Sequence, residues 1–463
     1  MNKKIGMLGD SLEEIQRRLR GGSLTALRQL LPDQDILDAC REVNHCYRER
    51  TFGPVVTAFH FLLQAIQREQ SFEATCQELW TPVVAAYGLD PVTFNSSATS
   101  QARSRFPAAV FDRLVQKACI LDDKDVACWE GFRLLALDCA TVSMPAEAAL
   151  FAHFGRHRAR ETTVQYPLAT FSALLTVGNS LLVDHGFGPF DPGESKSAQP
   201  VLDRNLRPGD LLLADRGFSS GPSCVRIRRR GADFLMRKNA RLKVDKLPVL
   251  QRLGRNDFIT EVPISPVTLK TDPTLPLTYR VRIFKASIKT PAGKRIEEWF
   301  VTSLKDAKRF PPKKLARLYH RRWQVETSFL EFKVWFHADV LRGKTVDNVA
   351  KEFTAHVLAY QLVRRLIVQA ARKHHKRPTE LSCLNAVRWI LCFSGYMRYA
   401  PASALPLIFD RMLDAIAFTE IDVRPGRIEP RAITRERKHY SRLRIPRPQW
   451  RQQYFDLLNV SLS

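Results

Sequence analysis

Strand-like apolar runs between Phe132 and Met236 are the feature that most limits how this chain can fold. The first runs are separated by Gly178-Asn179, a turn signal compatible with a β-hairpin, and Pro208-Gly209 breaks the chain before a later run. The predicted order is strand 133–144, strands 166–177 and 180–187, helix 195–206, strand 210–214, helix 223–230 and strand 233–236. Three strands followed by alternating helices and strands predict an α/β sheet of mixed direction.

The regions on either side have a different pattern. Residues 1–125 read as short helices punctuated by prolines, with Leu24, Leu27, Leu30 and Leu31 spaced for one helical face. Further predictions are a β-rich insertion at 240–305, one long helix from Pro311-Pro312 to about Ala338, a helix at Val346–Lys373 and helical character over 381–393. A chain of 463 residues exceeds the size of a single core. We therefore expect domains at 1–125, 126–376 and 377–463.

The charge balance points to a polyanionic partner. Lys and Arg number 72 against 47 Asp and Glu, which gives a net charge of +25. DNA, RNA and anionic membranes all remain candidates on charge alone. The start of the chain lacks the apolar core of a signal peptide, and no run approaches the roughly 18 apolar residues of a spanning helix, so no membrane association is expected. The nine scattered cysteines form no CxxC pair and favour reduced, buried thiols over disulfides or a zinc site.

Two basic segments are candidates for contact with nucleic acid. Residues 97–119 resemble two helices meeting at Pro107, with Arg103 and Arg105 near the turn. A helix-turn-helix-like DNA reader and ordinary helix packing with solvated arginines both fit this segment. Residues 424–451 carry ten Lys or Arg and only two acids, which fits a phosphate-binding arm or a solvated tail.

Two carboxylates follow apolar strands directly. Asp138 comes after Leu134–Leu137, and Asp215 comes after Leu211–Ala214. Either residue alone is explained by a helix cap or a turn. Two such carboxylates on neighbouring strands repel each other unless cations lie between them, and their hard oxygen ligands favour Mg²⁺ or Mn²⁺.

A third carboxylate, Glu326, belongs to the predicted long helix. Tyr319, Arg322, Glu326 and Lys333 fall within one narrow stripe at about 100° per residue. An apolar stripe beside it should pack on the sheet and comprises Leu318, Val325, Phe329, Phe332 and Phe336. A surface ion-pair ladder explains the charges but neither Tyr319 nor the apolar stripe. Three carboxylates with adjacent cationic groups suit phosphoryl transfer by two metal ions.

The spacing Tyr-x2-Arg-x3-Glu-x6-Lys resembles the YREK signature of cut-and-paste transposases of insertion-sequence family Four. Leu213-Ala214-Asp215-Arg216-Gly217-Phe218 resembles the second-aspartate motif of that family, and Leu137-Asp138 resembles the first. The resemblance covers about 132–373. It implies an RNase H-like core that carries the triad Asp138, Asp215 and Glu326 and is interrupted by the β-rich insertion, with helical regions on both sides.

The resemblance also implies an activity. The chain would bind the terminal inverted repeats of an insertion sequence, cleave at the ends and join them to target DNA. Two Mg²⁺ ions per site, replaceable by Mn²⁺, would be held by the triad, and a homodimer would hold two double-stranded ends. The location would be the cytoplasm of a prokaryote, at the nucleoid.

DNA-binding roles follow for several further residues. Tyr319, Arg322, Lys333 and Arg216 would contact DNA near the cut. Trp299 resembles a tryptophan that stacks on a flipped base in some relatives, and a packed aromatic of the insertion is the alternative.

One departure from the family pattern is Cys139, where relatives usually have Gly. It keeps open a catalytically inactive, transposase-derived DNA-binding protein. An RNase H-like nuclease that only hydrolyses is the other alternative, and the basic arm and the Tyr-Arg-Glu-Lys stripe argue against it. A membrane-surface protein is the least favoured alternative, because this chain lacks the basic amphipathic helix that such a protein needs.

Overall fold

The computed structural model describes residues 24–48, 50, 52–67, 72–87, 96–156, 166–190, 194–289 and 295–421, together with a few isolated positions near the C-terminus. The chain divides into units 1–421 and 422–463, and the following description concerns the first. Apart from the isolated position Gln449, the predicted basic arm at 424–451 lies outside the described residues. None of the described helices combines the length and the apolar character needed to span a membrane.

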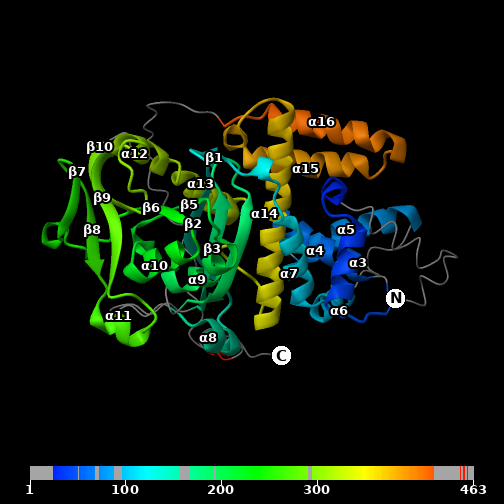
Figure 1. The fold of residues 1–463 in the computed structure, drawn as a ribbon. Helices are drawn as coiled ribbons and strands as arrows, with labels where there is room; N and C mark the ends of the chain where they lie inside the picture. The colour runs from blue at the N-terminus through cyan, green and yellow to red at the C-terminus, as the bar shows by residue number, and fades with distance from the viewer. Residues whose placement is uncertain are drawn as a thin grey trace. The chain divides into compact units, whose positions relative to one another are not determined.

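A ten-stranded mixed sheet forms the centre of this unit (Figure 1). Its strands are β1 (Cys128–Trp129), β2 (Phe132–Ser143), β3 (Leu168–Thr176), β4 (Leu182–Pro189), β5 (Asp210–Ala214), β6 (Asp233–Arg237), β7 (Val249–Gly254), β8 (Asp257–Pro263), β9 (Thr278–Lys289) and β10 (Arg295–Thr302). They follow the order β4-β3-β2-β5-β6-β10-β9-β8-β7, and β1 pairs with β2 at its edge. Strands β2, β3 and β4 are antiparallel, whereas β2, β5 and β6 are parallel. The mixed α/β core and the predicted hairpin are confirmed.

The segment 240–305 is β-rich, as predicted, but its strands do not form a separate layer. Strand β10 pairs antiparallel with β6, so β7 to β10 extend the central sheet. The short helix α11 (Pro266–Thr271) lies between β8 and β9. The insertion therefore lengthens the same sheet that carries Asp215.

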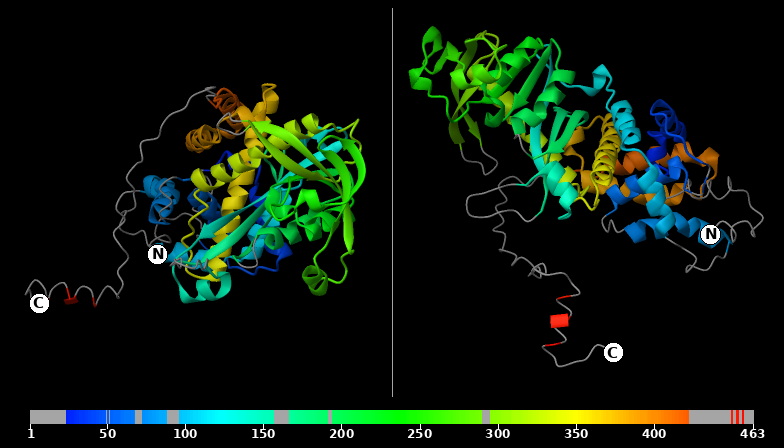
Figure 2. Two further views of the ribbon diagram at one scale, coloured as in Figure 1. Left: turned by 90° about the vertical axis from the view of Figure 1, so that its left-hand side faces the viewer. Right: turned by 90° about the horizontal axis from the view of Figure 1, so that it is seen from below.

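Helices cover both faces of the sheet (Figures 1 and 2). One face, here called the α9 face, packs against α9 (Glu194–Asn205) and α10 (Gly221–Arg229). The other, here called the α13 face, packs against α8 (Ala148–Phe154), α12 (Pro312–His320), α13 (Trp323–Val334) and α14 (Val346–Lys373). Strand β5 is buried along its whole length because both of its faces are covered.

Helix α14 lies between the sheet and the remaining helices (Figure 1). Its first turn is capped by Thr345, whose hydroxyl accepts a hydrogen bond from the amide of Asn348 at 3.2 Å. The helices beyond it are α3 (Asp33–Glu42), α4 (Pro54–Ile66), α5 (Phe72–Tyr87), α6 (Ser96–Arg105), α7 (Ala108–Ala118), α15 (Cys383–Met397) and α16 (Leu405–Ala417). Both the predicted helix over Val346–Lys373 and the helical character over 381–393 are therefore present in the structure.

The N-terminal region contains one wrong prediction. The stretch from Leu24 to Leu31 forms only the 3₁₀ turn η2 (Leu27–Gln29) instead of an α-helix. Pro32 explains the difference, because the residue before a proline is disfavoured in the α conformation and the next helix begins at Asp33.

The two helices expected over 97–119 are present as α6 and α7, with Pro107 between them. Arg103 points inward, with its guanidinium 3.7 Å from the ring centre of Phe61 and 3.0 Å from Nδ1 of His60. Arg105 is exposed. For Arg103 the structure therefore supports helix packing rather than contact with DNA.

The predicted single helix from Pro311-Pro312 to about Ala338 is wrong. It is divided into α12 and α13 at Arg321 and Arg322, where the amides of residues 321, 322, 324 and 325 bond three residues back instead of four. These tighter 3₁₀ bonds interrupt the α-helical period. Helix α13 ends at Val334, because the following turn contains His337 at a positive φ of 48°.

Candidate active site

The pairing of β2 with β5 brings Asp138 level with Asp215. Leu134 pairs with Leu211 and Ala136 with Leu213, so the same offset joins the two aspartates at the point where β5 ends. Side chains alternate along a strand, and the even positions of β2 share the α13 face with the odd positions of β5. Both carboxylates therefore lie on the α13 face of neighbouring strands.

The same row continues onto β6 with a basic residue. Leu213 pairs with Leu235, and the register carries Asp215 to Arg237. The Arg237 guanidinium donates to Oδ1 of Asp215 at 2.9 Å from Nε and 2.6 Å from Nη2. Arg237 also lies 4.0 Å from Glu298 of β10. A line of charged side chains thus crosses three strands of an otherwise apolar face.

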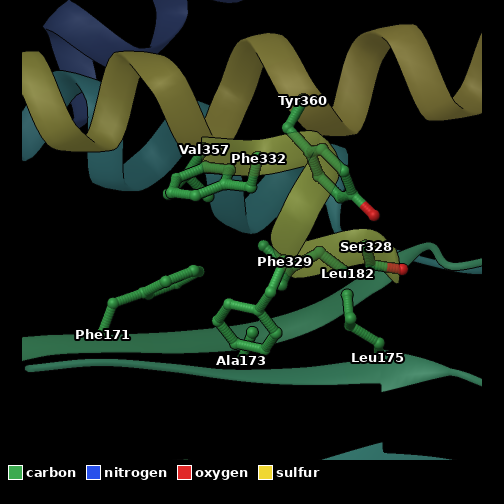
Figure 3. A pocket seen from close by; sticks show the side chains of 9 residues that line it. All are labelled: Phe171, Ala173, Leu175, Leu182, Ser328, Phe329, Phe332, Val357 and Tyr360. Carbon is green, nitrogen blue, oxygen red and sulfur yellow. The ribbon is translucent and has the colours of Figure 1, made fainter. Parts of the chain in front are cut away.

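Glu326 reaches this row from the first turn of α13. The helix is anchored by Phe329 and Phe332, which pack under α14 and above β3 (Figure 3). The side chains in this contact are Phe171, Ala173, Leu175, Leu182, Ser328, Phe329, Phe332, Val357 and Tyr360. The predicted apolar stripe of this helix is buried, whereas the Glu326 side chain keeps 51% of its surface exposed. The packing of Phe329 and Phe332 further along α13 thus fixes the position of the accessible Glu326 carboxylate.

Arg322 connects Glu326 with Asp138. Its Nη2 donates to Oε1 of Glu326, and its Nη1 lies 3.6 Å from Oδ2 of Asp138. The Arg322 side chain is only 2% exposed, and its Nε has no hydrogen-bond partner among the described residues. A buried guanidinium therefore stands between two of the three predicted catalytic carboxylates.

The two aspartates have different electrostatic environments. Burial raises the pKa of Asp138 to about 6, although the amide of Cys139 and the charge of Arg322 oppose the shift. Burial also acts on Asp215, but the amide of Arg216 and the guanidinium of Arg237 outweigh it, so the pKa of Asp215 lies below its usual value. Asp215 is the better compensated of the two negative charges.

The donor set fits hard divalent cations in type, since it consists of carboxylate oxygens. In the part of the chain that the structure describes, no three acidic, histidine or cysteine side chains converge closely enough to enclose a metal ion as they stand. The guanidinium groups of Arg322 and Arg237 supply positive charge at these carboxylates instead. These two guanidinium groups thus compensate the negative charge of carboxylates that a bound metal ion would otherwise compensate.

The remaining predicted site residues on this face differ in exposure. Tyr319 is buried, and its hydroxyl lies 3.3 Å from the carbonyl oxygen of Ala214, directly before Asp215. Arg216 is exposed immediately after Asp215, and Lys333 is half-buried on α13. Arg216 is accessible to DNA as it stands, whereas Tyr319 and Arg322 are covered.

Trp299 lies on the α9 face, opposite to the carboxylates. It packs against the buried cluster of that face, with its ring centre 6.5 Å from that of Phe258. The neighbouring Glu298 has the orientation of Phe300, which contributes to the α13 face. This arrangement supports a packed aromatic for Trp299, and a role in stacking on a base stays a prediction.

Cys139 also points to the α9 face. Its Sγ lies 3.7 Å from the carbonyl oxygen of Glu194, and its side chain packs with the buried cluster there. The Cβ that distinguishes Cys from Gly therefore does not project between Asp138 and Asp215. Cys139, the residue that left an inactive protein as an alternative, therefore does not obstruct the space between the two aspartates.

Arg237 and Glu194 also lie at the site, although neither was predicted from the sequence. Arg237 directly follows the strand predicted at 233–236, and only the pairing of β6 with β5 brings it to Asp215. Glu194 begins α9, and its charge raises the pKa of both Asp138 and Cys139. No spacing signal links these residues to the carboxylates, because Arg237 joins them through sheet pairing and Glu194 through the packing of α9 on the sheet.

Comparison with known proteins adds independent information. Residues 172–362 match the family model described as a transposase DDE domain. The chain is 25% identical over 349 residues to the transposase InsG for insertion sequence element IS4 of Escherichia coli K12, covering 73% of this chain and 76% of that protein. It is 25% identical over 214 residues to the transposase for insertion sequence element IS421 of Escherichia coli, covering 39% and 57%. A structure of the piggyBac transposase synaptic complex with hairpin DNA superposes with a TM-score of 0.43 at 10% identity, covering 89% of this chain and 88% of that chain.

Proposed function

We propose that the chain is a DDE-type DNA transposase related to the IS4 transposase, and that Asp138, Asp215 and Glu326 are its catalytic carboxylates. The observation that carries the proposal is the strand register that levels Asp138 with Asp215, together with the Arg322 bridge from Asp138 to Glu326. DDE transposases generally use divalent metal ions, and DNA is their substrate.

We propose cleavage at the boundary of a terminal inverted repeat followed by joining to target DNA. Water attacks the phosphorus at the boundary, the bond from phosphorus to the 3′ oxygen breaks, and that oxygen takes up a proton. The freed 3′-OH then attacks a phosphorus of the target strand and displaces the 3′ oxygen there. Two Mg²⁺, or Mn²⁺ in their place, held by the three carboxylates would lower the pKa of the attacking hydroxyl and stabilise the leaving oxygen.

The neighbouring side chains have positioning and binding roles in this proposal. Arg322 orients Asp138 and Glu326, and Arg237 orients Asp215. The Tyr319 hydroxyl fixes the end of α12 against the strand that leads to Asp215. Arg216 and Lys333 bind phosphates of the cleaved strand, and Tyr319 and Arg322 reach DNA only when the site opens. The acting form is a homodimer on two transposon ends, at the nucleoid of a prokaryotic cytoplasm.

A labelled fragment carrying the inverted repeat tests this function. The purified protein is incubated with the fragment in Mg²⁺ or in EDTA, and the products are resolved on a denaturing gel. We expect a nick at the repeat boundary in Mg²⁺ only, and its loss in Asp138→Ala and Asp215→Asn while binding to the fragment persists. Binding without any nick by the parent protein would instead support an inactive, transposase-derived DNA-binding protein.

A further inference from the structure

The outer face of α12 carries a row of exposed basic residues. Lys313, Arg317 and Arg321 follow one another at intervals of four residues, so their side chains lie on one side of the helix. The row is about 12 Å long at 1.5 Å of rise per residue. The opposite side of α12 is buried on the sheet through Leu315 and Leu318.

The row stands between two hollows of the surface. A hollow of about 430 Å³ on the side of β1 is lined by Trp129 and Lys314 beside the row itself. A second hollow, of about 720 Å³, on the side of β9 and β10 adds Lys285 and Arg295. Lys313 and Arg317 border both hollows. The row is therefore a basic ridge that a large, extended ligand can approach from either side.

The charges of this ridge are not neutralised within the protein. Among the described residues, the side chains of Lys313, Arg317 and Arg321 have no acidic partner, whereas Lys314 pairs with Glu130 at 2.7 Å. Like charges four residues apart destabilise a helix. The packing of α12 on the sheet therefore does not explain why three positively charged side chains lie in one row.

Helix α10 on the α9 face provides the contrast within the same molecule. Arg226 pairs with Asp272, Arg228 with Asp233, and Arg230 with Asp203. Three of the four arginines at this end of α10 are thus balanced by aspartates, and the fourth, Arg229, donates to the carbonyl oxygen of Thr274. The ridge on α12 lacks this balance and leaves its charge available to a polyanion.

The ridge ends beside the candidate active site. Arg321 directly precedes Arg322, which contacts Asp138 and Glu326. Near the same end of α12, the Tyr319 hydroxyl lies 3.3 Å from the carbonyl oxygen of Ala214. A strand that lies along the ridge would therefore run toward the carboxylates.

We propose that the ridge formed by Lys313, Arg317 and Arg321 binds the sugar-phosphate backbone of the target duplex. This inference rests on the proposed function. Transposon ends have to be recognised by sequence, whereas a target is held by what all duplexes share, and phosphate contacts carry no sequence information. Each strand has one phosphate per about 3.4 Å of the duplex axis, so a ridge that lies along this axis spans about three to four phosphates of one strand.

The first test needs no catalysis and measures binding to a duplex without the repeat sequence as salt is varied. The variant Lys313→Gln/Arg317→Gln/Arg321→Gln is compared with Arg226→Gln/Arg228→Gln/Arg230→Gln, which loses the same formal charge from paired positions. Three lost phosphate contacts lower the slope of log affinity against log salt by about 2.7, so the parent loses about 40-fold more affinity than the ridge variant between about 50 and about 200 mM salt. The α10 variant should keep the slope of the parent. An unchanged slope in the ridge variant, or equal loss in both variants, overturns the proposal.

The second test separates the target from the transposon end. A precut, labelled end is supplied with target plasmid, and joined products are counted, while nicking of an uncut end is followed in parallel. The ridge variant should nick at the rate of the parent but join at least about 10-fold less at low target concentration, with recovery as target DNA is raised. If nicking and joining fall together, the ridge holds the transposon end and the assignment to the target is wrong. If the parent binds the duplex but never nicks, the proposed function is wrong. The slope of log affinity against log salt in the first test then still shows whether the ridge binds DNA.

Discussion

The two faces of the sheet differ in what the same strands present on them. On the α13 face, β2, β5 and β6 present Asp138, Asp215 and Arg237 in one row. On the α9 face, β2 and β10 present Cys139 and Trp299 to an apolar cluster. Because side chains alternate, a shift of one residue moves a side chain from one face to the other. The charged groups that we propose for the chemistry thus belong to one face, and the other face serves packing.

The largest effect that this comparison predicts is at Glu326. Glu326→Gln keeps the shape of the side chain but removes a charged ligand, so nicking of an end fragment should fall by at least about 10³-fold. Binding to the fragment, measured by gel shift, should persist. Glu380→Gln, at an exposed ion pair in the C-terminal helices, is the matched control and should nick like the parent. Nicking by Glu326→Gln at the rate of the parent would show that Glu326 is not a catalytic carboxylate.

Arg322 comes next, since it acts through the carboxylates. Arg322→Gln leaves Asp138 and Glu326 without their shared guanidinium and should slow nicking by about 10- to 100-fold, the usual range for a residue that orients a ligand. The Mg²⁺ concentration that gives half-maximal nicking should change as well, which a purely structural role would not produce. Arg377→Gln, at an exposed pair, controls for loss of one arginine. An unchanged Mg²⁺ dependence would contradict the positioning role.

Trp299 tests the other face through stability. Trp299→Leu removes part of a half-buried side chain from the α9 cluster and should lower the free energy of unfolding by about 1–3 kcal/mol in urea titration. The nicking rate per folded molecule should stay that of the parent. A variant that folds as stably as the parent but nicks slowly would restore the prediction of a base-stacking tryptophan.

Cys139 should give the smallest effect. Its side chain points away from Asp138, so Cys139→Ala should change the free energy of unfolding by less than about 1 kcal/mol. Nicking should match the parent within the error of the assay. Markedly faster nicking by Cys139→Ala would mean that the cysteine obstructs the site, and the separation of the two faces would fail at β2.

Much of the core could be predicted from the sequence. The apolar runs before Asp138 and Asp215 correctly predicted β2 and β5, because a short apolar run between turn signals is typical of a buried strand. The apolar stripe from Leu318 to Phe336 correctly predicted the buried side of α12 and α13. The triad itself came from spacing combined with a family resemblance.

The features that were missed depend on long-range pairing. The division at Arg321 and Arg322 is not marked by glycine or proline, and helical periodicity alone predicted one continuous helix. Arg237 joins the site through the register of β6 with β5, which no local pattern encodes. Trp299 was predicted near the site by likeness of a short motif, although the strand alternation gives that face to Glu298.

The central claim is that the three carboxylates on the α13 face together bind the metal ions of the reaction. Diffraction from crystals of the protein with an end fragment and Mn²⁺, recorded for anomalous scattering, tests it most directly. We predict manganese bound by Asp138, Asp215 and Glu326, and no such density in Asp138→Ala crystals. Manganese bound by other residues, with Asp138 and Glu326 still paired to Arg322, would contradict the claim.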